Sequence, residues 1–136
     1  MKRFFRHVKW LIVALFGIGA TAGCGALRGT PVPTPTPAIV RISADQAAQA
    51  MQNDEFYSDY RGDILQVTGT VSAVTQVNGQ TAVELETSIP RIVRCYLDDP
   101  ASAPKAGSTV TVEAASADGQ REDDAVGLLH CKVIGP

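Results

Sequence analysis

Apolar and polar residues alternate with a period of two over most of the second half of the chain, which is typical of β-strands with one buried face. Five segments show this alternation: 64–74, 81–88, 91–97, 108–116 and 125–134. The Asn78-Gly79 pair between the first two segments indicates a tight hairpin turn. The pattern therefore predicts five strands, the first two of which form a hairpin.

The same alternation predicts which side chains of each strand face the core. Gly69 lies at the centre of the inward face of the first strand, where a glycine indicates a bend or a bulge. The other positions expected to face inward are Leu65, Val67, Val71, Ala73, Val83, Leu85, Val93, Cys95, Leu97, Val110, Val112, Ala114, Leu129, Cys131 and Val133.

One short helix is predicted before the strands, over residues 44–53. Ser43 followed by Gln46 is a capping box, and the sequence ADQAAQAMQN after Ser43 is rich in residues that favour helices. Its apolar residues repeat at helical spacing, so the helix should pack against the sheet with one face.

The first 22 residues have the layout of a secretory signal. Residues 1–9 carry four basic side chains and no acidic one, and residues 10–22 are uncharged and end in small side chains. A helix needs about 20 apolar residues to span a bilayer, so this run is too short for a comfortable membrane anchor. Export is the better interpretation.

The end of the uncharged run, Thr21-Ala22-Gly23-Cys24, resembles the lipobox of bacterial lipoprotein signal peptides. The resemblance implies that residues 1–23 are removed and that Cys24 is diacylated, becoming the first residue of the mature chain. Acyl chains contribute about 0.8 kcal/mol of membrane affinity per buried CH₂ group. The alternatives are an ordinary signal that leaves Cys24 as a free thiol, and a retained anchor.

Residues 24–38 are rich in proline and threonine and predict a tether between Cys24 and the strands. Pro31, Pro33, Pro35 and Pro37 fix their own φ and push the preceding residues toward extended conformations. At about 3.1 Å per residue, such a segment reaches about 40 Å. Residues 39–136 then form one folded domain.

Cys95 and Cys131 both fall on inward faces of their strands, the third and the fifth. In an exported, oxidising setting this predicts a disulfide between the two strands. Closing a loop of about 37 residues contributes on the order of 3 to 4 kcal/mol in the chain-entropy account. The alternative is a pair of buried free thiols that pack as small apolar groups.

The strand pattern resembles the tRNA_anti-like OB-fold family of small bacterial proteins, over residues 42–134. The resemblance rests on Tyr60 and Gly62 before the first strand, on Val67, Gly69 and Val71 within it, and on Cys95 and Cys131. It implies a mostly β domain, namely a five-stranded Greek-key OB-fold barrel with an N-terminal α-helix. It implies little about activity.

These features predict a lipid-anchored envelope protein whose OB-fold domain is a binding or adaptor module for a protein, peptide or glycan. The domain would face the periplasm or the exterior from the cell membrane or the outer membrane. OB-folds bind ligands across the second and third strands, where Glu84, Glu86, Arg94 and Tyr96 point outward. The alternative is that these four side chains are only a solvated sheet face.

The composition argues against two other functions. Residues 38–136 hold seven basic and fourteen acidic side chains, a difference of −7, which disfavours the alternative function of single-stranded nucleic-acid binding. Catalysis, a cofactor and a metal are not predicted, because the domain has one histidine, His130, and no metal-ligand spacing. The acidic pair 98–99 and the acidic run 122–124 are interpreted as solvating charge.

Overall fold

The structure of the chain is a computed structural model that describes residues 33–136. The predicted signal segment, Cys24 and the first part of the tether lie outside the described residues. The elements are β1 (Ile39–Ser43), α1 (Ala44–Gln52), α2 (Phe56–Asp59), β2 (Ile64–Val77), β3 (Gln80–Leu85), β4 (Ile92–Leu97), η1 (Pro100–Ser102), β5 (Thr109–Ala115), η2 (Ser116–Asp118), β6 (Gly119–Arg121) and β7 (Ala125–Gly135). No helix in this range is long and apolar enough to cross a membrane.

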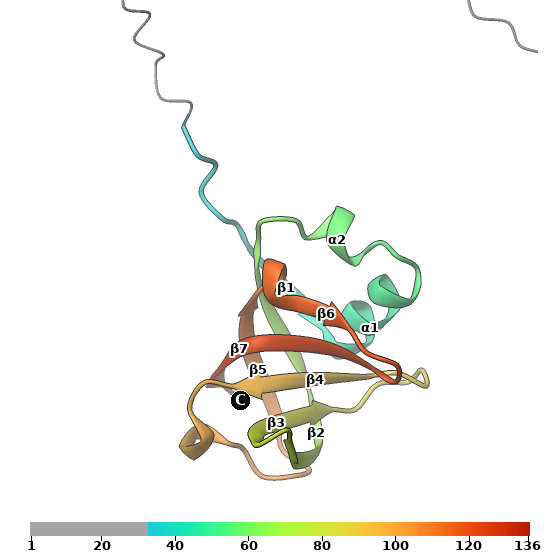
Figure 1. The fold of residues 1–136 in the computed structure, drawn as a ribbon, viewed down its shortest axis with the longest axis vertical. Helices are drawn as coiled ribbons and strands as arrows, with labels where there is room; N and C mark the ends of the chain where they lie inside the picture. The colour runs from blue at the N-terminus through green and yellow to red at the C-terminus, as the bar shows by residue number, and fades with distance from the viewer. Residues whose placement is uncertain (1–32) are drawn as a thin grey trace, which may run out of the picture. The chain divides into compact units, whose positions relative to one another are not determined.

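Five of the strands pair in a ring, which Figure 1 shows around the centre of the fold. The strand order is β2-β3-β4-β7-β5, and β5 pairs again with β2, so the path of pairing returns to its start. The β4–β7 pair is parallel, and the other four pairs are antiparallel. The prediction of a mostly β domain is confirmed, although the structure has seven strands and not five.

The two additional strands are β1 and β6. β1 runs parallel to the first half of β2, with Ile39 opposite Ile64, because β3 pairs only with the second half of β2 and leaves this side open. β6 pairs with β7, with Gly119 opposite Leu128. The sequence predicted a loop, and not a strand, over the residues of β6. Both strands are too short to show a clear alternation, and the partner of β1 lies 25 positions further along the chain.

The predicted helix is confirmed as α1, together with its capping box. The Ser43 hydroxyl accepts a hydrogen bond from the Gln46 amide at 3.1 Å, and the Gln46 side chain accepts one from the Ser43 amide at 2.8 Å. The helix packs against β2 at Gly69, where a Cβ atom would lie only 3.0 Å from the Cβ of Ala44. Gly69 therefore gives room for the helix, and the irregularity of β2 lies between Val71 and Ala73 and not at Gly69.

The inward faces of the strands agree with the prediction except at Ala73 of β2 and in β7. Ala73 was predicted to face inward, but the register shift after Val71 places it opposite Glu84, on the outer face. Leu128 is fully buried, whereas Leu129, which was predicted to face inward, is only half-buried. The alternation shifts because the register slips between Cys95 and Leu97 of β4, and His130 adopts a positive φ of 52°. The irregularity returns Cys131 to the inward face.

Candidate functional site

The outer face of β3 and β4 brings together three of the four side chains that were predicted to form a binding face. Glu84 and Arg94 lie directly opposite each other in the strand register, and Arg94 Nη2 lies 3.0 Å from Glu84 Oε1. Tyr96 comes from the same face of β4. Glu86 lies after the end of β3, is exposed, and does not take part in this group.

A fourth side chain, Glu122, joins this group from the loop between β6 and β7. Its carboxylate pairs with Arg94 Nη1, accepts a hydrogen bond from the Tyr96 hydroxyl at 2.7 Å and accepts another from the Gln120 side-chain amide at 3.0 Å. We call Glu84, Arg94, Tyr96, Gln120 and Glu122 the Glu122 cluster. The interpretation of Glu122 as solvating loop charge was wrong, because three donors hold its carboxylate.

The loop that carries Glu122 is held in place by two further features. The Arg91 guanidinium donates to the backbone oxygens of Glu122 and Ala125 at 2.9 and 3.2 Å. Gly127 lies beneath the carboxylate, and a Cβ atom at this position would lie 2.4 Å from Glu122 Oε1 and 2.7 Å from Gln120 Cγ. A side chain at position 127 would therefore displace the ends of the Glu122 and Gln120 side chains from these positions.

The cluster is largely shielded from water, and this shifts the pKa values of its members. The side chains of Glu84, Arg94 and Glu122 are 15 to 17% exposed. Partial burial raises the pKa of Tyr96, and the hydrogen bond to Glu122 and the charge of that carboxylate raise it further. Burial by itself lowers the pKa of Arg94, but the bonds to Glu84 and Glu122 outweigh it and raise this pKa above its ordinary value.

Through these contacts Glu122 connects the loop between β6 and β7 to Arg94 and Tyr96 of β4. Arg94 faces Glu84 and Glu122, with Asp124 at 3.7 Å, so the group carries one positive and three negative charges. The polar atoms of Arg94 and Tyr96 that were predicted to contact a ligand are used within the chain. An anionic ligand would meet a surface that is already negative.

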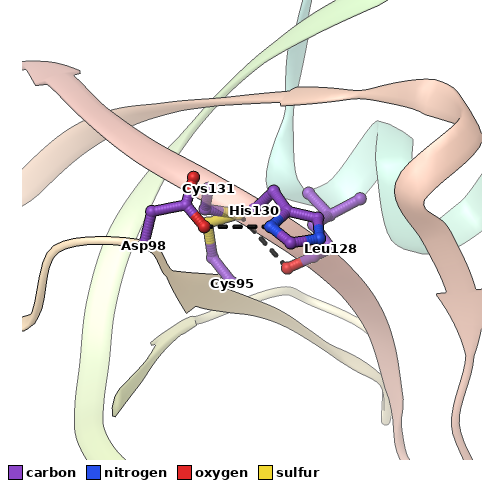
Figure 2. The surroundings of a disulfide bond; sticks show 5 residues. All are labelled: Cys95, Asp98, Leu128, His130 and Cys131. Atoms are coloured by element: carbon purple, nitrogen blue, oxygen red, sulfur yellow. Dashed lines mark hydrogen bonds and ion pairs between the residues drawn. A yellow bond between two sulfur atoms is a disulfide. The ribbon is translucent and has the colours of Figure 1, made fainter. Parts of the chain in front are cut away.

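The predicted cysteine pair, Cys95 and Cys131, forms the disulfide shown in Figure 2. Both residues are buried, their Cα atoms are 5.8 Å apart, and the bond joins β4 to β7 across 36 positions of sequence. The predicted bridge is thereby confirmed. The sulfur of Cys131 also lies 3.3 Å from the backbone oxygen of Leu128.

His130 lies next to this disulfide in sequence but turns away from it, as Figure 2 shows. Its Nδ1 lies 3.0 Å from a carboxylate oxygen of Asp98, and both side chains are largely exposed. The pair connects the irregular turn of β7 to the residue after the end of β4. Within residues 33–136, no three His, Cys, Asp or Glu side chains gather in a way that could hold a metal ion.

The role of Glu122 could not be read from the sequence. It lies in an acidic run, which normally indicates a solvated loop, and its partners Arg94 and Tyr96 are 28 and 26 residues away. Gly127 was the only signal, since a glycine inside a strand often marks a close approach of another group.

Comparison with known proteins adds no family to this description. No protein-family model matches the chain, and no curated protein sequence matches it.

Proposed function

We propose that this chain is an envelope lipoprotein whose domain is an OB-fold that serves as a binding or adaptor module. The connectivity supports the fold assignment. β2, β3 and β4 follow one another as a meander, β5 pairs with β2, and β7 lies between β4 and β5, parallel to β4. This is the order of a five-stranded Greek-key ring. β1 and β6 are additions at its margin.

The proposed location in the cell envelope is supported mainly by the buried disulfide between Cys95 and Cys131. Such bonds persist in oxidising compartments and are rare where thiols are kept reduced. The bond uses both cysteines of the domain, so Cys24 has no partner within residues 33–136 and is available for a lipid. The basic and apolar segments before Cys24 provide the export signal.

The way the chain enters the domain is consistent with a tethered module. The Ala38 oxygen accepts a hydrogen bond from the Ile64 amide at 2.8 Å, and the Ala38 amide donates to Asp63 Oδ1 at 3.3 Å. β1 then follows β2 for five residue pairs. A force on the tether would be carried by this parallel pairing and not by the Glu122 cluster or the disulfide.

The charge of the described face favours a protein, peptide or glycan partner over a nucleic acid. The Glu122 cluster with Asp124 carries two more negative than positive charges. Nucleic-acid binding rewards clustered Lys and Arg and stacked aromatic side chains. Tyr96, the aromatic residue of this face, is buried and bound to Glu122.

Metabolic labelling with a tritiated fatty acid tests the lipid anchor. The wild-type chain should incorporate the label and enter the detergent phase of a Triton X-114 extract, and Cys24→Ala should incorporate none. The double variant Cys95→Ala, Cys131→Ala is the matched control, because it removes two cysteines and should keep the label. A wild-type chain without label would contradict the proposal.

A further inference from the structure

A cavity of about 780 Å³ opens beside α2 and η2, away from the Glu122 cluster. It is lined by Asp54, Tyr57, Ser58, Arg61 and Ser116, among others. Small-molecule sites typically measure about 300 to 1,000 Å³ and combine apolar walls with a few polar groups. The cavity therefore has the size and the mixed lining of a ligand site.

Tyr57 provides a fixed aromatic wall. Its hydroxyl donates to the Gly119 backbone oxygen at 3.1 Å, and its ring packs edge-to-face on buried Phe56, with ring centres 5.6 Å apart. The side of Tyr57 that these contacts leave uncovered is open, since the residue is 51% exposed. An aromatic ring that is held at both ends but open on one side can stack on the apolar face of a ligand without further ordering.

The cavity also presents a guanidinium group that is not held in an ion pair. Arg61 is exposed and forms no ion pair with any residue in the range 33–136. Asp54, the acidic residue of the lining, is bound by Arg121, which also donates to the Met51 backbone oxygen. A free guanidinium favours a carboxylate or a phosphate, which it can bind with two parallel hydrogen bonds.

Ser116 adds a polar group without a partner. The residue is 4% exposed, and its hydroxyl has no hydrogen-bond partner among the described residues. A buried polar group in this state costs about 1 to 3 kcal/mol, and such groups in folded proteins call for an explanation. Rotation of this hydroxyl toward the cavity would let it bond a ligand hydroxyl, as the exposed Ser58 also could.

We propose that this cavity binds a small anionic sugar, one that carries a carboxylate or a phosphate. The carboxylate or phosphate of the sugar binds Arg61, the apolar face of its ring stacks on Tyr57, and its hydroxyls meet Ser58 and Ser116. This assignment deepens the proposed function by naming a ligand class for the module. It rests on the domain being a binding module and not on the lipid at Cys24.

Titration of the ¹⁵N-labelled full chain in detergent micelles tests the assignment. Glucuronate, glucose 6-phosphate and neutral glucose are added separately while amide chemical shifts are followed. At least one of the two acids should cause saturable shifts confined to Tyr57, Ser58, Arg61, Ser116 and their neighbours. Glucose should bind at least tenfold more weakly.

Variants separate the contributions of the charge and of the ring. Arg61→Gln should weaken binding of the acid at least tenfold, whereas Arg41→Gln, the same change on exposed β1, should leave it unchanged. Tyr57→Ala should also weaken binding at least tenfold, and Tyr57→Phe, which keeps the ring, should retain most of it. A normal amide spectrum for each variant shows that it is folded.

Three outcomes would overturn the assignment: no saturable shift with either acid, equal affinity for glucose, or equal affinity of wild type and Arg61→Gln. Shifts centred on the Glu122 cluster would overturn it too. Failure here leaves the fatty-acid label on Cys24 unaffected. Loss of that label likewise leaves the sugar titration unaffected, so the two proposals fail separately.

Discussion

Replacing Glu122 by glutamine tests whether the Glu122 cluster stabilises the fold or is an ordinary solvated surface. The substitution keeps the size and shape of the side chain and removes its negative charge. An amide oxygen can still accept from the Tyr96 hydroxyl, which now lies 2.7 Å from Glu122 Oε1. The amide nitrogen then faces the Arg94 guanidinium. Both groups are hydrogen-bond donors, so the bond that Arg94 donates to the Glu122 carboxylate is lost.

The cost can be worked out from the groups that change partner. Arg94 keeps its bond to Glu84 at 3.0 Å, so the lost interaction is one charge-assisted hydrogen bond. Such bonds contribute about 1.5 to 3 kcal/mol when they are shielded from water. Exposed ion pairs contribute about 0 to 1 kcal/mol. Because Arg94 and Glu122 are only 15 and 17% exposed, we expect a loss of about 2 kcal/mol.

Urea denaturation followed by circular dichroism measures this loss as a shift of the unfolding midpoint at an unchanged slope. Asp123→Asn is the matched control, because it makes the same chemical change one residue further on, at an exposed position. It should alter the free energy of unfolding by less than about 0.5 kcal/mol. Equal, small effects of the two substitutions would refute the reasoning and make the cluster an ordinary solvated surface.

Three further predictions concern the disulfide, the packing of α1 and the alkaline stability. Replacing both Cys95 and Cys131 by alanine should lower the free energy of unfolding by about 4 kcal/mol, by the chain-entropy relation for two cysteines separated by 36 positions. Urea melts of oxidised wild type and the variant check this, and a loss below about 1 kcal/mol would contradict it. Gly69→Ala should cost about 1 to 3 kcal/mol in the same melts because its Cβ meets Ala44 and Leu85 at 3.0 and 3.2 Å, whereas Gly135→Ala, with open space around its Cβ, should cost almost nothing, and equal costs would argue against the tight packing. Because its pKa is raised in the folded state, Tyr96 favours folding most below about pH 10, so stability should fall as pH rises above that value, and less steeply in Tyr96→Phe; identical pH profiles would refute the assigned role of burial.

The sequence predicted those features that depend on regular alternation. Val67, Val83 and Val112 lie in the core as their parity requires, and the same parity placed Cys95 and Cys131 on inward faces. The helix start was predictable because a capping box involves only neighbouring residues, Ser43 and Gln46.

The features that were missed depend on contacts between distant parts of the chain. The parity of β7 fails at Leu129 because His130 takes a positive φ and shifts the register, and no local residue preference marks this position. In the sequence, Glu122 cannot be told apart from the other carboxylates of its acidic loop, because its partners Arg94 and Tyr96 lie in a distant strand. The cavity at Tyr57 likewise needs η2 beside α2, which the alternation of neither segment encodes.

The most direct test of the central claim, a lipid-anchored envelope module, is the intact mass of the chain isolated from the membrane fraction, measured after thiol alkylation with and without reduction. The account predicts a mature chain that begins at Cys24 and carries acyl groups. Without reduction no thiol should be alkylated, and after reduction two should be, at Cys95 and Cys131. A chain without acyl groups, or one whose Cys95 and Cys131 are alkylated before reduction, would contradict it.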